Sequence, residues 1–94
     1  TKMQIHQVFM DRCVELLVEH KLTTETASMI KYSATEMCSN VVDECLQLFG
    51  GYGYIWDYPI ARMYADNRVA RIYAGTNEIM KIVIARGLFK DVSK

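Results

Sequence analysis

The sequence predicts an all-α fold, an antiparallel bundle of about four helices that forms a single domain over residues 1–94. Apolar residues recur every three to four positions along most of the chain, which is the period of an amphipathic helix. No segment keeps the apolar–polar alternation that is typical of a strand. The five glycines and the single proline fall at a few sites, so long uninterrupted helices fit between them.

The first predicted helix runs from the first residues to about His20. Its apolar side chains lie on one face: Ile5, Val8, Phe9, Cys13, Leu16 and Leu17. Charged side chains occupy mostly other positions, so this helix is amphipathic. After a short break, the hydroxyl of Thr23 or Thr24 is suited to cap the next helix.

The second predicted helix is the longest, because nearly 25 residues after Thr24 contain no Gly or Pro. Its apolar period is carried by Ala27, Ile30, Ala34, Met37, Cys38, Val41, Cys45 and Leu48. Gly50-Gly51 ends this helix, because glycine readily adopts the left-handed conformation of a helix C-terminus. The two long helices are expected to lie antiparallel.

Two shorter helices are predicted after this point. Residues 52–57 are aromatic and glycine-rich, and we expect an ordered loop there. Tyr58-Pro59 begins a helix that ends near Asn67, because proline is well tolerated in the first turn. A connector over residues 68–75 leads to a last helix that opens at Thr76 and continues close to the C-terminus.

Charge and hydropathy exclude several classes of partner. A formal net charge of zero, from 11 basic and 11 acidic residues, gives no electrostatic footprint for a nucleic acid or an anionic membrane. The longest stretch without charge, residues 45–56, is too short and too rich in glycine to span a bilayer. A chain of this length buries about 60–65% of its unfolded surface, which predicts an adequate but marginal core.

The histidines and cysteines do not form a recognisable metal site. His6 and His20 lie 14 residues apart, with no thiol or carboxylate arranged around them as zinc ligands. Cys38 and Cys45 share a helix face, which favours core packing. Three cysteines cannot all pair with one another, so a reducing compartment, such as the bacterial cytoplasm or the mitochondrial matrix, fits best.

Gly50-Gly51-Tyr52-Gly53 is the first motif that points to chemistry. A dinucleotide-binding fingerprint follows a strand and opens a helix, whereas these glycines follow a helix, so that mechanism is excluded. Two interpretations stay open: a helix stop with a tight loop, or a backbone that a ligand approaches closely. The neighbouring aromatic residues fit either a lid on the bundle or a ligand contact: Tyr52, Tyr54, Trp56 and Tyr58.

Ala74-Gly75-Thr76-Asn77-Glu78 is the second motif. Gly75 frees the backbone to turn, and Thr76 is a good N-cap. The first-turn amides of the following helix point outward with the positive end of its dipole, so the motif fits a structural cap and an anion site equally. Two interpretations are open for three nearby arginines. They bind phosphates, or they are solvated or paired with acidic side chains: Arg62, Arg68 and Arg71.

These motifs occur in a characteristic order. Gln47 to Tyr54, then Tyr58-Pro59, then an arginine-rich short helix, then Ile72 to Ile79 together resemble the C-terminal helical domain of the acyl-CoA dehydrogenase family. The resemblance is clearest from about Val41 to Leu88. Two separate motifs at family-like spacing carry it.

The resemblance implies a flavoenzyme that introduces a trans double bond between C2 and C3 of an acyl-CoA thioester. In that family a carboxylate takes the C2 proton while FAD accepts a hydride from C3. The resemblance assigns FAD contacts, the first five of them across a subunit interface, to Gln47, Leu48, Phe49, Gly50, Gly51, Thr76, Asn77 and Glu78. It places Tyr73, Ala74 and Gly75 beside the thioester end of the substrate.

The resemblance also implies partners. They are an acyl-CoA substrate, a homodimer or homotetramer in the parent enzyme, and electron-transfer flavoprotein as the electron acceptor. A nucleic-acid partner and a membrane span are not expected.

One residue departs from the pattern of many relatives, in which the glutamate base directly precedes the Gly-Thr pair. Ala74 occupies that position here, as in long-chain and isovaleryl-type members, which carry the base on an earlier helix. We therefore expect no catalytic residue in this chain and a base upstream of Thr1. The chain is expected to be a C-terminal fragment that is inactive alone. The alternatives are a non-catalytic helical oligomerisation module and the same domain of an acyl-CoA oxidase.

Overall fold

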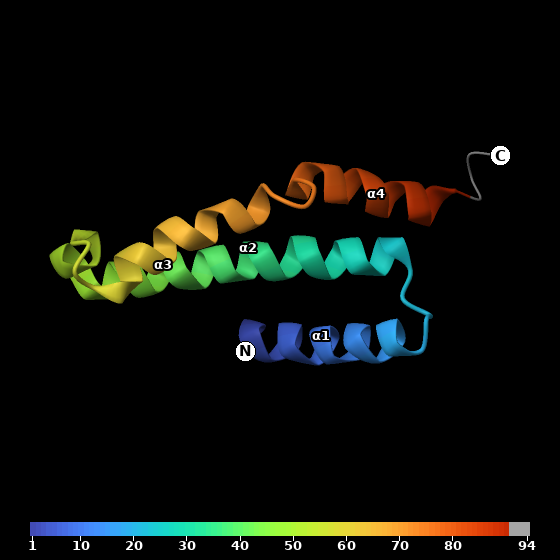
Figure 1. The fold of residues 1–94 in the computed structure, drawn as a ribbon, viewed down its shortest axis with the longest axis horizontal. Helices are drawn as coiled ribbons and strands as arrows, with labels where there is room; N and C mark the ends of the chain where they lie inside the picture. The colour runs from blue at the N-terminus through green and yellow to red at the C-terminus, as the bar shows by residue number, and fades with distance from the viewer. Residues whose placement is uncertain (91–94) are drawn as a thin grey trace.

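The computed structural model describes residues 1–90, and four α-helices make up most of this part of the chain (Figure 1). They are α1 (Lys2–Val18), α2 (Thr24–Phe49), α3 (Pro59–Arg68) and α4 (Asn77–Phe89). Two short 3-10 helices, η1 (Gly50–Tyr54) and η2 (Val69–Arg71), lie in the connections. Within residues 1–90 there is no strand, so the predicted all-α class is confirmed.

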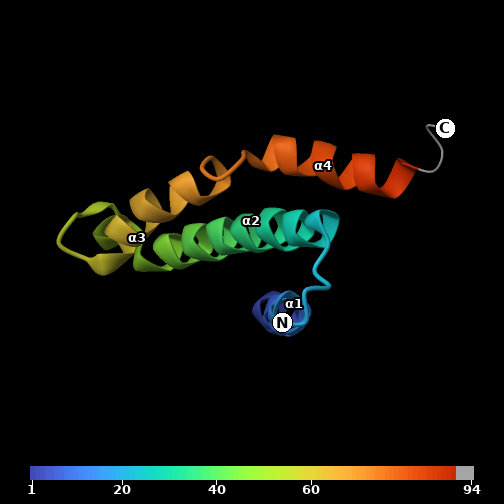
Figure 2. The ribbon, with the colours of Figure 1, turned by 45° about the vertical axis from the view of Figure 1, so that its right-hand side comes forward.

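Helix α2 is the central element, and the other three helices pack along it. Figure 1 shows α1 on one side of α2, and α3 followed by α4 along the other side, all three running antiparallel to α2. In Figure 2, α1 is seen nearly end-on while α2 and α4 are still seen from the side, so α1 crosses α2 obliquely. The bundle is antiparallel as predicted, with α3 and α4 placed end to end on one side of α2.

This arrangement is elongated and buries little. The principal extents are 54 × 26 × 21 Å, and the radius of gyration is 16.3 Å, against about 12 Å for a compact domain of this length. The buried apolar side chains of the described part are Cys13, Ile30 and Ile60. The prediction of an adequate core is therefore wrong for residues 1–90, because no further element in that range covers the outer faces of the helices.

Helix α1 is an example of this incomplete burial. Cys13 of its predicted apolar face is buried against α2, whereas Ile5, Val8 and Leu17 of the same face are each 60% exposed. Since α1 crosses α2 obliquely, only part of its apolar stripe reaches a neighbour. None of the helices within residues 1–90 combines the length and the apolar character needed to cross a bilayer.

The helix ends follow the predicted signals with two differences. Thr23 caps α2, and its Oγ1 accepts a hydrogen bond of 3.1 Å from the amide of Thr26. Pro59 is the first residue of α3, as expected. Helix α1 ends at Val18 rather than near His20, because His20 takes a left-handed φ of 59° and turns the chain toward α2. The expected loop after α2 is in part the 3-10 helix η1.

Candidate functional site

The end of α2 and the 3-10 helix η1 form an exposed corner, residues 47–54, called the first corner below. Gly50 has a φ of 60°, which ends α2 and reverses the chain. The five predicted FAD contacts in this corner are all exposed: Gln47, Leu48, Phe49, Gly50 and Gly51. Leu48 continues the apolar period of α2, yet it is 87% exposed and belongs to no core within residues 1–90.

The glycines of the first corner differ in whether backbone conformation or packing excludes a side chain at their position. Gly50 needs its left-handed φ, which disfavours a side chain. Gly53 is buried, and a Cβ there would lie 2.6 Å from the carbonyl oxygen of Leu46. Gly51 has neither constraint, since no heavy atom lies within 4 Å of a Cβ built on it. Its small size leaves open space in front of the backbone.

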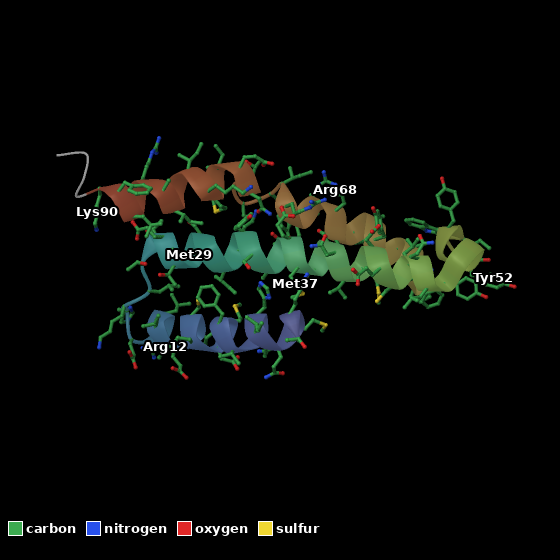
Figure 3. The ribbon with its side chains drawn as sticks, turned by 180° about the vertical axis from the view of Figure 1, so that it is seen from behind. Arg12, Met29, Met37, Tyr52, Arg68 and Lys90 are labelled. Carbon is green, nitrogen blue, oxygen red and sulfur yellow. The ribbon has the colours of Figure 1, made fainter. Side chains whose placement is uncertain are left out.

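The aromatic residues of this region do not form a lid on the bundle. Tyr54 is 93% exposed and Trp56 is 62% exposed, and Figure 3 shows Tyr52 at the tip of the molecule. Tyr58 contacts two other rings, with its centroid 5.2 Å from that of Tyr52 and 6.2 Å from that of Phe49. The lid interpretation is therefore wrong, because most of the surface of Tyr52, Tyr54 and Trp56 stays exposed instead of packing on the bundle.

The chain turns again before α4, at residues 72–78, called the second corner below. Ala74 and Gly75 both take left-handed φ values, 56° and 88°. Thr76 caps α4, and its Oγ1 accepts a hydrogen bond of 3.3 Å from the amide of Ile79. The first-turn amides of Asn77 and Glu78 have no acceptor inside the helix. The predicted thioester contacts, Tyr73, Ala74 and Gly75, are exposed.

Asn77 anchors the second corner to α2. It is 2% exposed, and its side-chain oxygen accepts a hydrogen bond of 2.7 Å from Lys31 Nζ. Its Nδ2 donates to Thr35 Oγ1 at 2.9 Å and to Glu36 Oε1 at 3.0 Å. Both amide hydrogens of the side chain are thus used inside the protein. Any ligand contact of Asn77 falls to its backbone amide.

A small cavity adjoins the start of α4 and is lined by basic, acidic and neutral side chains. Its volume is ≈ 100 Å³, and it is lined by Glu36, Arg68, Arg71, Ile72, Thr76, Asn77 and Glu78. Arg71 Nη1 donates to Glu36 Oε2 at 3.2 Å, while Arg71 Nε is buried with no hydrogen-bond partner in the described residues. The hydrogen bond from Asn77, and then Arg71, lower the pKa of the Glu36 carboxyl. The guanidiniums and the free helix amides are donors that an anion accepts from, while Glu36, paired with Arg71, and Glu78 balance the charge of the two arginines.

The two corners lie far apart in one chain (Figure 1). The second corner contacts α2 at Lys31, and Gly50 of the first corner lies 19 residues later. At the rise of an α-helix this separation is about 28 Å. A single chain therefore does not bring the two sets of predicted FAD contacts into one cleft.

Lys31, Thr35 and Glu36 were not predicted as part of a site. Lys31 and Thr35 are four residues apart, which is also the spacing of an ordinary solvated helix face, and Glu36 directly follows Thr35. Their shared partner, Asn77, lies more than 40 residues later, so no local signal identifies it. Of the arginines, Arg71 pairs with Glu36, and Arg62 Nη1 donates to the carbonyl of Trp56 at 2.9 Å.

Comparison with known proteins identifies the family. Residues 1–89 match the family model described as the acyl-CoA dehydrogenase C-terminal domain. A long-chain specific acyl-CoA dehydrogenase of Mus musculus mitochondria is 48% identical over 91 residues, which are 97% of this chain and 21% of that protein. The CarC subunit of the caffeyl-CoA reductase–Etf complex of Acetobacterium woodii is 38% identical over 96% of this chain and 24% of its own length.

Solved structures agree with this assignment. An acyl-CoA dehydrogenase from Geobacillus kaustophilus superposes with a TM-score of 0.91 at 46% identity, covering 94% of this chain and 23% of that one. The chain thus spans about a quarter or less of the length of the relatives named here. By sequence and by fold, the chain belongs to the acyl-CoA dehydrogenase family, and its residues 1–89 correspond to the C-terminal domain of that family.

Proposed function

We propose that this chain is the C-terminal part of an FAD-dependent acyl-CoA dehydrogenase that forms the C2–C3 double bond of an acyl-CoA thioester. Within that enzyme, the chain helps to bind FAD and completes a subunit interface, and the chain alone is inactive. Membership of the family supports this role, as does the small share of each relative that the chain spans. Bound FAD would accept the hydride from C3.

The cavity at the start of α4 is the observation that carries the proposal. The buried Nε of Arg71 lacks an acceptor, and Arg68 lines the same cavity. Beside them are the hydroxyl of Thr76 and the free amides of Asn77 and Glu78. This donor set suits the pyrophosphate of FAD, because phosphate oxygens accept several charge-assisted hydrogen bonds at once.

The first corner would contact FAD through its backbone. No steric contact within the chain requires glycine at position 51. The close approach of a flat nucleotide to the backbone would require it, because a side chain there would block the approach. Leu48 and Phe49 are exposed apolar side chains next to it. Since the two corners are about 28 Å apart in one chain, we place the first corner of one subunit at the FAD of another.

This arrangement requires a homodimer or homotetramer, because each cofactor site then needs residues from two copies. The exposed apolar residues support such an assembly. Helix α1 alone exposes Met3, Ile5, Val8, Met10, Val14, Leu17 and Val18. Burial of these side chains, in the rest of the parent protein or in a second subunit, would stabilise the folded state by the hydrophobic effect.

Tyr73, Ala74 and Gly75 would lie beside the thioester. Ala74 has no titratable group, so we place the base that takes the C2 proton upstream of Thr1. The Etf-complex relative supports electron-transfer flavoprotein as the acceptor. The mitochondrial relative supports the mitochondrial matrix, or the cytoplasm in a bacterium, as the location.

Purification of the full-length parent protein tests the proposal. It is expected to purify yellow with bound flavin and to lose its visible flavin absorbance when an acyl-CoA is added without an acceptor. A colourless, folded oligomer would contradict the proposal and would favour a non-catalytic helical module.

A further inference from the structure

Lys31 joins the middle of α2 to the second corner. Its Nζ donates to the carbonyl oxygen of Gly75 at 2.7 Å and to Asn77 Oδ1 at 2.7 Å. Gly75 lies 44 residues further along the chain, so this contact is a tertiary one. Two of the three ammonium hydrogens are thus directed at adjacent residues on either side of Thr76.

The position of this lysine is electrostatically unfavourable for the helix that it contacts. A cation at the positive end of a helix dipole is repelled by the unpaired amides of the first turn. Acidic side chains offset part of this repulsion, since Glu78 lies in the first turn of α4 and Asn77 also donates to Glu36. An anion bound at the first-turn amides would offset the rest of the repulsion.

The backbone next to the lysine contacts is conformationally strained. Ala74 and Gly75 are consecutive left-handed residues, and this conformation is sterically unfavourable for an alanine, because its Cβ lies too close to the following carbonyl oxygen. The hydrogen bond from Lys31 to the Gly75 carbonyl fixes this turn, and the hydrogen bond to Asn77 fixes the first residue of α4. Together they set the direction in which Thr76 and the first-turn amides point.

We propose that Lys31 is a positioning residue that orders the second corner so that Thr76 and the amides of Asn77 and Glu78 face the pyrophosphate of FAD. This role rests on the proposed function. Lys31 acts through Gly75 and Asn77 and touches neither substrate nor the reacting atoms. Loss of its ammonium leaves two carbonyl oxygens without their donor and frees the turn.

The test uses three variants of the full-length flavoprotein: Lys31→Met, Lys31→Arg and Gly87→Ala. Lys31→Met removes the donors at similar length, and Lys31→Arg retains a charged donor. Gly87→Ala is the matched structural control, because a Cβ there overlaps the side chain of Glu25 and forces it to move at the far end of the same α2–α4 contact. For each variant the Kd for FAD, the thermal midpoint of the apoprotein and the amide hydrogen exchange of residues 72–79 are measured.

We expect Lys31→Met to raise the Kd for FAD about tenfold, the effect of a buried polar group left without its partner. Exchange is expected to rise at residues 72–79 and to stay unchanged at the end of α4. Lys31→Arg should recover most of the affinity, and Gly87→Ala should lose less affinity for an equal fall in thermal midpoint. If Lys31→Met binds FAD like the wild type, or loses no more than Gly87→Ala at equal stability, Lys31 has no positioning role. A wild-type protein without flavin would instead overturn the proposed function itself.

Discussion

The side-chain amide of Asn77 donates a hydrogen bond of 3.0 Å to Oε1 of Glu36, and this contact joins the first residue of α4 to the middle of α2. The same amide also donates to Thr35, so one 2%-exposed asparagine satisfies two acceptors on α2. Few side chains are buried within residues 1–90, so this polar contact is a main determinant of the conformation of the second corner.

Replacement of Asn77 should therefore be costly. Asn77→Ala leaves Lys31, Thr35 and Glu36 without a shared partner, and we expect a loss of about 2–3 kcal/mol in the free energy of unfolding of the full-length protein. Asn40→Ala on the exposed side of α2 is the control, with little expected change. Chemical denaturation measures both variants, and equal stability of the two would refute the structural role of Asn77.

The Glu36 carboxyl predicts a specific response to acid. Asn77 and Arg71 lower its pKa from the ordinary value of 4.5. A carboxyl whose pKa is lowered by folding stabilises the folded state above its unfolded pKa, and this stabilisation is lost as the pH falls through the folded pKa. The urea midpoint of the wild type should therefore fall more steeply below pH 4.5 than that of Glu36→Gln. Parallel curves for the two proteins would show that Glu36 is not involved.

Two glycines of the first corner should give opposite phenotypes. Gly51→Val has room in its own chain, so it should leave the thermal midpoint of the apoprotein unchanged and reduce the amount of FAD retained. Gly53→Ala meets the Leu46 carbonyl and should lower the thermal midpoint. Unchanged flavin content in Gly51→Val would count against a ligand at the first corner.

Ala74 should tolerate glycine unusually well. In the interior of α2, Ala34→Gly should lower the free energy of unfolding by about 1 kcal/mol. Ala74→Gly should not lower it, because glycine adopts the left-handed φ of 56° without steric cost. The variant should also keep its activity, since Ala74 supplies no titratable group. A loss of turnover with unchanged folding would mean that the side chain at this position does more than fill space.

Much of the fold could be predicted from local signals. The caps at Thr23 and Thr76, the stop at Gly50 and the start at Pro59 are each set by neighbouring residues, and the structure has all four. The core could not be predicted, because periodicity shows which face of α1 is apolar and not whether another element covers it. Ile5 and Cys13 belong to the same predicted stripe, yet only Cys13 is buried.

The candidate site divides in the same way. Both corners were visible as glycine-punctuated motifs. The polar network behind the second corner was not, because Lys31 and Asn77 are joined by the packing of α4 on α2. The motifs also did not show that the two corners lie at different places along α2. That separation results from the length of α2.

Mixed oligomers test the central claim, that the two corners serve one FAD from two different subunits. Gly51→Val damages the first corner and Thr76→Val damages the second, and each homo-oligomer should retain little flavin. Both variants are coexpressed with different tags, and the mixed pairs are isolated by sequential affinity purification for measurement of flavin per subunit. If the corners act across the interface, each mixed pair contains one undamaged site and regains flavin. If the mixed pairs are as poor in flavin as the parents, the corners do not share a cofactor across subunits.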